Sequence, residues 1–275
     1  MDIKCIALDL DGTTLDREGR LPPENRQALE YAIGKGVHIV IASGRSFDSL
    51  PRELVSLSGI EYAITSNGAA VYHVPTGRRL HSYALEPRSV QAILCLTSGG
   101  PAVYEAFVDG KAYADAAYVA DPVGHGATPQ AIPYIQRTRR PVADIAVFIR
   151  AHIRELDGLD LVVPDEETKG RLWALLKGHV PDIYITSSVR QLIEISHRDA
   201  GKHSGVRYVA ELLGLSSGQI AAFGDGDNDA DMLSYVGCGI AVANASPACL
   251  AAADHVTVRH DQGGVARGIY DILQI

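Results

Sequence analysis

The chain has 275 residues, of which 47% are apolar and 21% charged, and its formal net charge is −8 at pH 7. This length allows one large domain or two of ordinary size, and the composition is typical of a globular protein. The negative charge argues against a nucleic-acid partner, and no apolar run is long enough to span a membrane. The opening residues MDIKCIALD lack the pattern of a secretory signal, so we expect a cytoplasmic protein, either a monomer or a homodimer.

The spacing of the cysteines does not indicate a disulfide-bonded or zinc-binding protein. The four of them are scattered without paired spacing, which argues against a zinc site or a set of disulfides; they are Cys5, Cys95, Cys238 and Cys249.

Short apolar runs alternate with helical patterns at both ends of the chain. Runs rich in Ile, Val and Ala predict strands that are buried on both faces of a parallel sheet. We predict strands at residues 3–8, 37–42, 62–65, 220–223 and 239–243. One apolar face and a glycine stop predict helices between them, at residues 23–36, 201–214 and 263–274. This alternation predicts a doubly wound, Rossmann-like α/β core.

The middle of the chain follows a different pattern. Residues 103–115 alternate around Asp109-Gly110, which predicts an antiparallel hairpin. Residues 144–150 and 182–195 also look like strands, and residues 166–178 look like a helix. We therefore predict an inserted α+β domain at residues 83–198, between the two halves of the core at residues 1–82 and 199–275.

Polar residues follow the predicted core strands. Asp9 and Asp11 come after the first, Ser43-Gly44-Arg45 after the second, Ser66-Asn67-Gly68 after the third, and residues 224–229 (GDGDND) after a later one. The carboxyl ends of parallel strands meet at one edge of the sheet, where ligands bind. As many as five carboxylates would gather there, and they require a cation.

Oxygen ligands of this kind favour Mg²⁺, which also keeps water and a substrate oxygen in its shell. The hydroxyl of Ser43, glycine amides and Asn228 would donate to a phosphate, and Lys202 would add positive charge near a helix start. With the phosphoryl oxygens neutralised, Asp9 would attack phosphorus to form an aspartyl-phosphate. Asp11 would protonate the leaving alcohol and later deprotonate water.

In these segments the sequence resembles the haloacid dehalogenase-like phosphohydrolases, in particular the Cof-type group with a large α/β cap. The resemblance rests on DLDGTTLD, IASGR, SNGA, the lysine helix after LIEIS, and FGDGDNDADML followed by YVGCGIAVANA. It implies Asp9 as nucleophile and Asp11 as general acid and base. It also implies Mg²⁺ ligation by Asp9, the main-chain carbonyl of Asp11 and Asp225, with Asp229 in support. The phosphate would be held by Leu10 (through its backbone), Ser43, Gly44, Lys202 and Asn228.

Two positions depart from the family pattern. His203 stands where a glycine usually follows the lysine, and Ala243 replaces the usual glycine before the late Asn-Ala pair. Neither departure removes a catalytic group.

The expected function is a Mg²⁺-dependent phosphatase of small phosphorylated metabolites, such as sugar phosphates, nucleotide-related phosphates or pyridoxal phosphate. The alternatives are a phosphosugar mutase and a non-catalytic phosphometabolite-binding protein. Taken alone, single residues favour simpler interpretations: Ser43 as a helix N-cap, Arg45 as a surface charge and Lys202 as a solvated helix lysine. Likewise, Arg137, Arg139 and Arg140 in the middle segment are most simply a solvated charge run.

Overall fold

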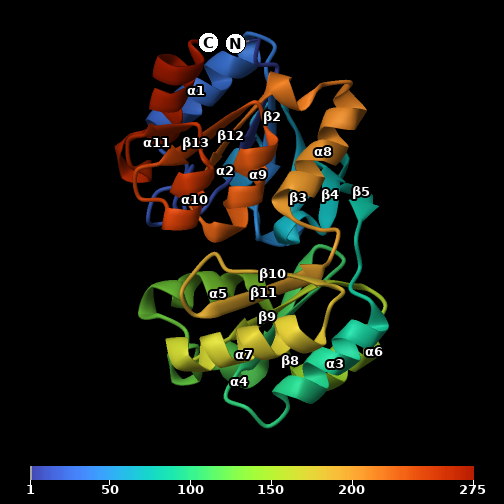
Figure 1. Cartoon of the computed structure of the whole chain (residues 1–275). Helices are drawn as coiled ribbons and strands as arrows, with labels where there is room; N and C mark the ends of the chain where they lie inside the picture. The colour runs from blue at the N-terminus through green and yellow to red at the C-terminus, as the bar shows by residue number, and fades with distance from the viewer. Residues whose placement is uncertain (1) are drawn as a thin grey trace. The chain divides into compact units, whose positions relative to one another are not determined.

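The computed structural model describes residues 2–275, which divide into two compact units (Figure 1). The first unit contains the residues up to Arg45, Leu50–His81 and Gly201–Ile275. The second contains Ser46–Ser49 and Ser82–Ala200. Within residues 2–275, no helix combines the length and the apolar character that crossing a bilayer requires.

The first unit is built on an eight-stranded sheet with the order β14-β13-β12-β1-β2-β3-β4-β5. Neighbouring strands from β14 to β3 are parallel, whereas β4 is antiparallel to β3. The strands are β1 (Cys5–Leu8), β2 (His38–Ala42), β3 (Ile60–Thr65), β4 (Ala70–His73), β5 (Arg78–Ser82), β12 (Ile220–Gly224), β13 (Cys238–Val242) and β14 (His255–Thr257).

Helices cover both faces of this sheet. On one face, Val206 of α8 and Met232 of α9 pack with Ala7 of β1 in one apolar cluster. On the other, the chain after α11 packs so closely on β12 that a Cβ at Gly268 would lie 2.2 Å from the Phe223 ring. The helices are α1 (Pro23–Gly34), α2 (Arg52–Val55), α8 (Lys202–Leu213), α9 (Ala230–Tyr235), α10 (Pro247–Ala252) and α11 (Gly264–Arg267), followed by a π-helical turn at Gly268–Leu273. The predicted doubly wound α/β core is confirmed.

The second unit contains a six-stranded sheet with the order β10-β11-β9-β6-β7-β8. All of its pairs are antiparallel except β7 with β8. The strands are β6 (Val103–Val108), β7 (Lys111–Asp115), β8 (Arg139–Val142), β9 (Leu156–Val162), β10 (Ile183–Thr186) and β11 (Leu192–His197). The helices are α3 (Pro87–Thr97), α4 (Ala116–Ala120), α5 (Ile132–Thr138), α6 (Ile145–Ala151) and α7 (Glu166–His179).

Two predictions for the middle segment need correction. Residues 144–150 were predicted as a strand, but residues 145–150 lie in helix α6 and Asp144 is its N-cap. The Asp144 carboxylate accepts a hydrogen bond from the Val147 amide at 2.9 Å, and Ile145 and Ile149 are buried one turn apart. The region 182–195 is two strands, β10 and β11, instead of one. The predicted hairpin around Asp109-Gly110 is present as β6 and β7.

A row of acidic side chains crosses the second sheet. Glu194, Asp160 and Glu105 stand directly opposite one another on the neighbouring strands β11, β9 and β6, and all three are buried. Arg139 forms an ion pair with Glu105, with Nε 2.8 Å from Oε2. Its side chain is buried, so Arg139 is not part of a solvated charge run. Burial and the charges of Glu194 and Glu105 raise the pKa of Asp160 well above its ordinary value. Asp160 is therefore protonated at pH values where an exposed aspartate is ionised.

This row predicts a pH-dependent stability. A carboxyl group whose pKa is raised by folding favours the folded state at low pH, and that contribution is lost as the pH rises towards the folded pKa. We expect Asp160→Asn to be more stable than wild type near pH 8, because the neutral amide needs no proton to remain buried. The gain should vanish near pH 4. Urea unfolding followed by the fluorescence of Trp173, the only tryptophan, measures it in this unit.

The exposed Glu86 supplies the matched control. Glu86→Gln also removes one negative charge from the second unit, but it should leave the pH dependence of the urea midpoint unchanged. A gain for Asp160→Asn that is the same near pH 4 and near pH 8 would contradict the assignment.

Candidate active site

Three buried or half-buried carboxylates meet at the carboxyl ends of β1 and β12. The two strands are parallel neighbours with Leu8 opposite Phe223, and the Asp9 amide continues the ladder by donating to the Phe223 carbonyl at 3.0 Å. Asp9 and the loop after Gly224 therefore lie side by side. One oxygen each from Asp9, Asp225 and Asp229 lies within 4.8 Å of the others.

Lys202 neutralises part of this cluster. Its side chain is fully buried, and Nζ donates to Asp9 Oδ1 and to Asp229 Oδ1, each at 2.6 Å. The interpretation of Lys202 as a solvated helix lysine is therefore wrong, because the tertiary fold brings the first residue of α8 against the end of β1.

Close backbone contacts set the position of α8. The Gly201 amide donates to the Asn67 carbonyl at 2.8 Å, and a Cβ at Gly68 would lie only 2.0 Å from the Gly201 carbonyl oxygen. Gly68 has a φ of 86°, so glycine is required there for both space and conformation. The turn after β3 thus fixes where Lys202 enters the cluster.

The cluster holds more negative charge than its single ammonium can balance. Burial raises the pKa of Asp9, and Asp229 raises it further, against the opposing effect of Lys202. Burial and Asp229 raise the pKa of Asp225 to about 6. Burial would lower the pKa of Lys202, but Asp229 and Asp9 outweigh it and raise that pKa, so the lysine stays charged. The excess charge favours a bound cation.

The residues fit Mg²⁺ in number and chemistry, because all their donors are oxygens. Both Asp229 oxygens are already used: Oδ1 accepts from Lys202, and Oδ2 accepts from the amides of Asp225 and Gly226 at 3.0 and 2.9 Å. This arrangement suits the supporting role expected for Asp229. Asp9 and Asp225 retain oxygens that could hold a metal ion.

Two further groups near Asp225 complete the candidate metal site. Thr13 Oγ1 donates to Asp225 Oδ1 at 2.8 Å and orients that carboxylate. A Cβ at Gly12 would lie 2.5 Å from Asp225 Oδ2, so only glycine leaves room for it. Thr13 was absent from the predicted site, although its place in the DLDGTT motif is a signal that could have found it.

Asp11 lies in a different environment from Asp9. Its side chain is 59% exposed, and both of its oxygens accept hydrogen bonds from Arg45, at 2.7 Å from Nε and 2.6 Å from Nη2. Arg45 itself is only 7% exposed, so its interpretation as a surface charge is wrong. In this structure Asp11 is therefore engaged by Arg45 through both of its oxygens.

The predicted phosphate-binding residues are held by hydrogen bonds between loops. Ser43 is buried after β2 but caps no helix, and its Oγ accepts from the Arg45 amide at 3.2 Å. Asn228 Nδ2 donates to Asn67 Oδ1 at 3.0 Å, and the Asn67 amide donates to the Ser43 carbonyl at 3.2 Å. Asn67, with a φ of 53°, therefore links two of these loops. Leu10 is fully buried in the turn after β1, and Gly44 directly follows Ser43.

A family model, curated relatives and solved structures all indicate similarity to hydrolases or phosphatases. A family model described as haloacid dehalogenase-like hydrolase matches residues 6–269. Phosphatase YwpJ of Bacillus subtilis is 29% identical over 98% of this chain and 100% of its own length. The 5-amino-6-(5-phospho-D-ribitylamino)uracil phosphatase YcsE of the same species is 26% identical over 98% and 95%. A solved structure of a haloacid dehalogenase-like hydrolase from B. subtilis has a TM-score of 0.83 and 25% identity, with coverage of 98% and 100%.

The buried lysine makes a direct prediction for stability. Lys202→Met leaves Asp9 and Asp229 without their cation and should destabilise the fold by about 3–5 kcal/mol near pH 7. The loss should shrink near pH 5, because carboxyl groups with raised pKa values take up protons there. Urea unfolding followed by far-UV circular dichroism measures both values.

Lys4→Met is the matched control, since Lys4 pairs with Asp2 at the surface. It should cost less than about 1 kcal/mol. A Lys202→Met protein as stable as the Lys4→Met protein would show that the lysine does not neutralise the cluster.

Proposed function

The chain belongs to the haloacid dehalogenase-like hydrolases, and from this membership and the acidic cluster we propose that it is a Mg²⁺-dependent phosphatase. Its substrates are small phosphorylated metabolites, and the reaction passes through an aspartyl-phosphate on Asp9. The observation that carries the proposal is the position of Lys202 Nζ, 2.6 Å from both Asp9 and Asp229 in a buried site. The phosphatase names of YwpJ and YcsE support the reaction class.

The proposed metal ligands are the carboxylates whose oxygens are not all engaged in hydrogen bonds. Asp9 and Asp225 hold Mg²⁺ together with the main-chain carbonyl of Asp11, and Asp229 supports Lys202. When bound, Mg²⁺ neutralises phosphoryl oxygens and so lowers the repulsion between a phosphate ester and Asp9. Lys202 contributes the second positive charge, and Ser43, Asn228 and the backbone at Leu10 and Gly44 orient the phosphate.

Two steps complete the reaction. In the first, an Asp9 oxygen forms a bond to phosphorus while the bond to the leaving oxygen breaks. Asp11, which takes up a proton from solvent when it leaves Arg45, gives that proton to the leaving oxygen. In the second, Asp11 takes a proton from water, the water oxygen bonds to phosphorus, and the Asp9–phosphorus bond breaks. Arg45 acts as a resting partner for Asp11, which must exchange this ion pair for a contact with the substrate. The inserted domain, residues 83–198, serves as the cap that selects the leaving group.

The nucleophile provides the central test. Asp9→Asn should lower the release of inorganic phosphate from p-nitrophenyl phosphate by at least about 1,000-fold, since the amide cannot form the phosphoenzyme. The melting temperature should be retained or raised, because the variant removes a buried negative charge. A broad panel of phosphate esters with Mg²⁺ extends the assay to metabolites.

Asp227→Asn is the control for this loop, because Asp227 accepts from Ser246 Oγ and lies outside the cluster. It should retain most of the activity. Phosphate release by Asp9→Asn at the rate of Asp227→Asn would remove Asp9 from its role. Formation of an isomeric phosphosugar without phosphate release would replace the phosphatase by the mutase.

Metal dependence should follow the titration of Asp225. Its pKa is about 6 in the metal-free protein, and only the ionised carboxylate binds Mg²⁺. The half-saturating Mg²⁺ concentration should therefore rise as the pH falls below 6, by up to about tenfold per pH unit. Activity measured against Mg²⁺ concentration at several pH values, after EDTA treatment, gives this dependence. In Asp225→Asn the requirement should be higher and should rise less steeply as the pH falls, because Asp9 is then the only titrating carboxylate of the pair; an unchanged dependence would exclude Asp225 as a ligand.

A further inference from the structure

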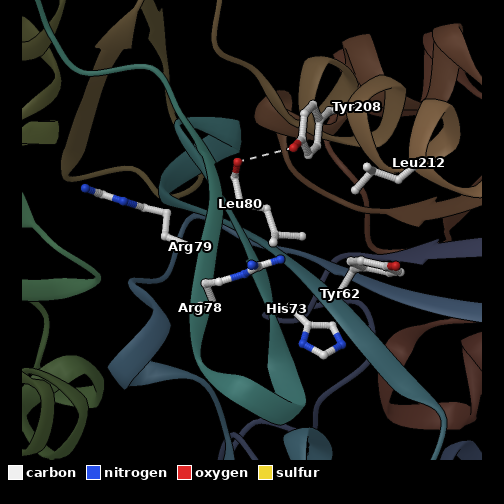
Figure 2. Close-up of a pocket in the computed structure, with 7 residues that line it drawn as sticks. All are labelled: Tyr62, His73, Arg78, Arg79, Leu80, Tyr208 and Leu212. Carbon is white, nitrogen blue, oxygen red and sulfur yellow. Dashed lines mark hydrogen bonds between the residues drawn. The ribbon is translucent and has the colours of Figure 1, made fainter.

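A cavity of about 570 Å³ lies beside helix α8 in the first unit, apart from the acidic cluster (Figure 2). Its size is in the range of small-molecule sites, about 300–1,000 Å³. The residues that line it come from β3, the end of β4, β5 and α8: Tyr62, His73, Arg78, Arg79, Leu80, Tyr208 and Leu212.

Helix α8 packs closely on β3 near the first turns of the helix. A Cβ at Gly205 would lie 2.3 Å from Ile64, so helix and strand are in direct contact there. Tyr62 lies two residues earlier on β3 and faces the same side of the sheet as Ile64. Tyr208 reaches across to the edge strand β5, where its hydroxyl donates to the Leu80 carbonyl at 3.2 Å (Figure 2).

The charge of the lining is entirely positive or neutral, although the chain as a whole carries −8. Figure 2 shows Arg78 directed towards the side of Tyr62 and His73, whereas Arg79 points away, as expected for neighbours on a strand. Within residues 2–275, the Arg78 guanidinium has no acidic partner and no hydrogen bond. This cation is therefore available to an anion.

Flat and apolar surfaces lie beside Arg78. Tyr62 and His73 are directly opposite each other on β3 and β4, with ring centroids 6.0 Å apart. Leu212 is 49% exposed at the same cavity. Such a lining offers contact to a ring, and Arg78 offers a bidentate partner for a phosphate.

We propose that this cavity is a second ligand site, which binds a small aromatic phosphate of the nucleoside monophosphate type. Arg78 pairs with the phosphate, and Tyr62 and Leu212 contact the ring. The site is separate from the catalytic cluster: Tyr208 follows Lys202 by six residues on α8, a rise of about 9 Å along the helix. The proposal is independent of the phosphatase activity, because no catalytic residue takes part.

Calorimetric titration of the full chain with AMP and with phenylphosphonate tests the site. Both probes carry a ring and a phosphorus oxyanion, and phenylphosphonate has no ester bond to hydrolyse. EDTA in the buffer removes metal-dependent binding at the catalytic cluster. We expect saturable binding of both probes, weakened at least about tenfold by Arg78→Gln, as for the loss of a charge-assisted hydrogen-bond pair. Arg267→Gln, at an exposed arginine elsewhere in the first unit, should bind like wild type.

A second variant separates the ring from the anion. Tyr62→Leu should weaken phenylphosphonate but leave the weaker binding of inorganic phosphate unchanged. Melting curves of both variants verify that they remain folded. Wild-type affinity in Arg78→Gln, equal losses of both ligands in Tyr62→Leu, or no saturable binding of either probe would overturn the proposal.

Discussion

The structure of the first unit depends on the burial of one ammonium group between two carboxylates. Lys202 is fully buried with both Asp9 and Asp229 at 2.6 Å, and a buried charge of this kind is tolerated only when it is paired. The start of α8 is held in this position by the turn after β3. In that turn Gly68 lies against the Gly201 backbone, and Asn67 adopts a left-handed conformation. The strand β1 can deliver Asp9 to a buried site because the lysine is already there.

The same problem of crowded carboxylates has two solutions in this chain. At the ends of β1 and β12, three carboxylates share one lysine, and their oxygens suit a divalent cation. In the second unit, Arg139 neutralises Glu105, while Asp160 keeps a proton because burial and its neighbours raise its pKa. The first cluster is balanced in part by the ammonium of Lys202, whereas in the second a proton on Asp160 removes one negative charge inside the sheet.

Helix α8 connects two chemically different places. Its first residue, Lys202, belongs to the acidic cluster, and Tyr208 and Leu212 further along line a cavity whose free cation is Arg78. Between these places, Gly205 lies in close contact with Ile64 of β3. One helix therefore carries the buried lysine of the acidic cluster at one end and part of the cavity lining further along.

The sequence by itself determined the doubly wound core, because fully buried strands such as β1 and β12 must be continuous apolar runs and polar groups collect at their ends. It also identified Asp9, Asp225 and Lys202 as candidates, through motif order. Only the tertiary structure decided that the run after Asp144 forms helix α6, because a short apolar run is compatible with a strand or a helix until capping and packing favour one of them. The burial of Asp160 on β9, of Arg45 and of Asn67 was also decided only by the tertiary structure. Whether an acidic, cationic or amide side chain is buried depends on partners that are distant in the sequence, and a local sequence pattern does not show them.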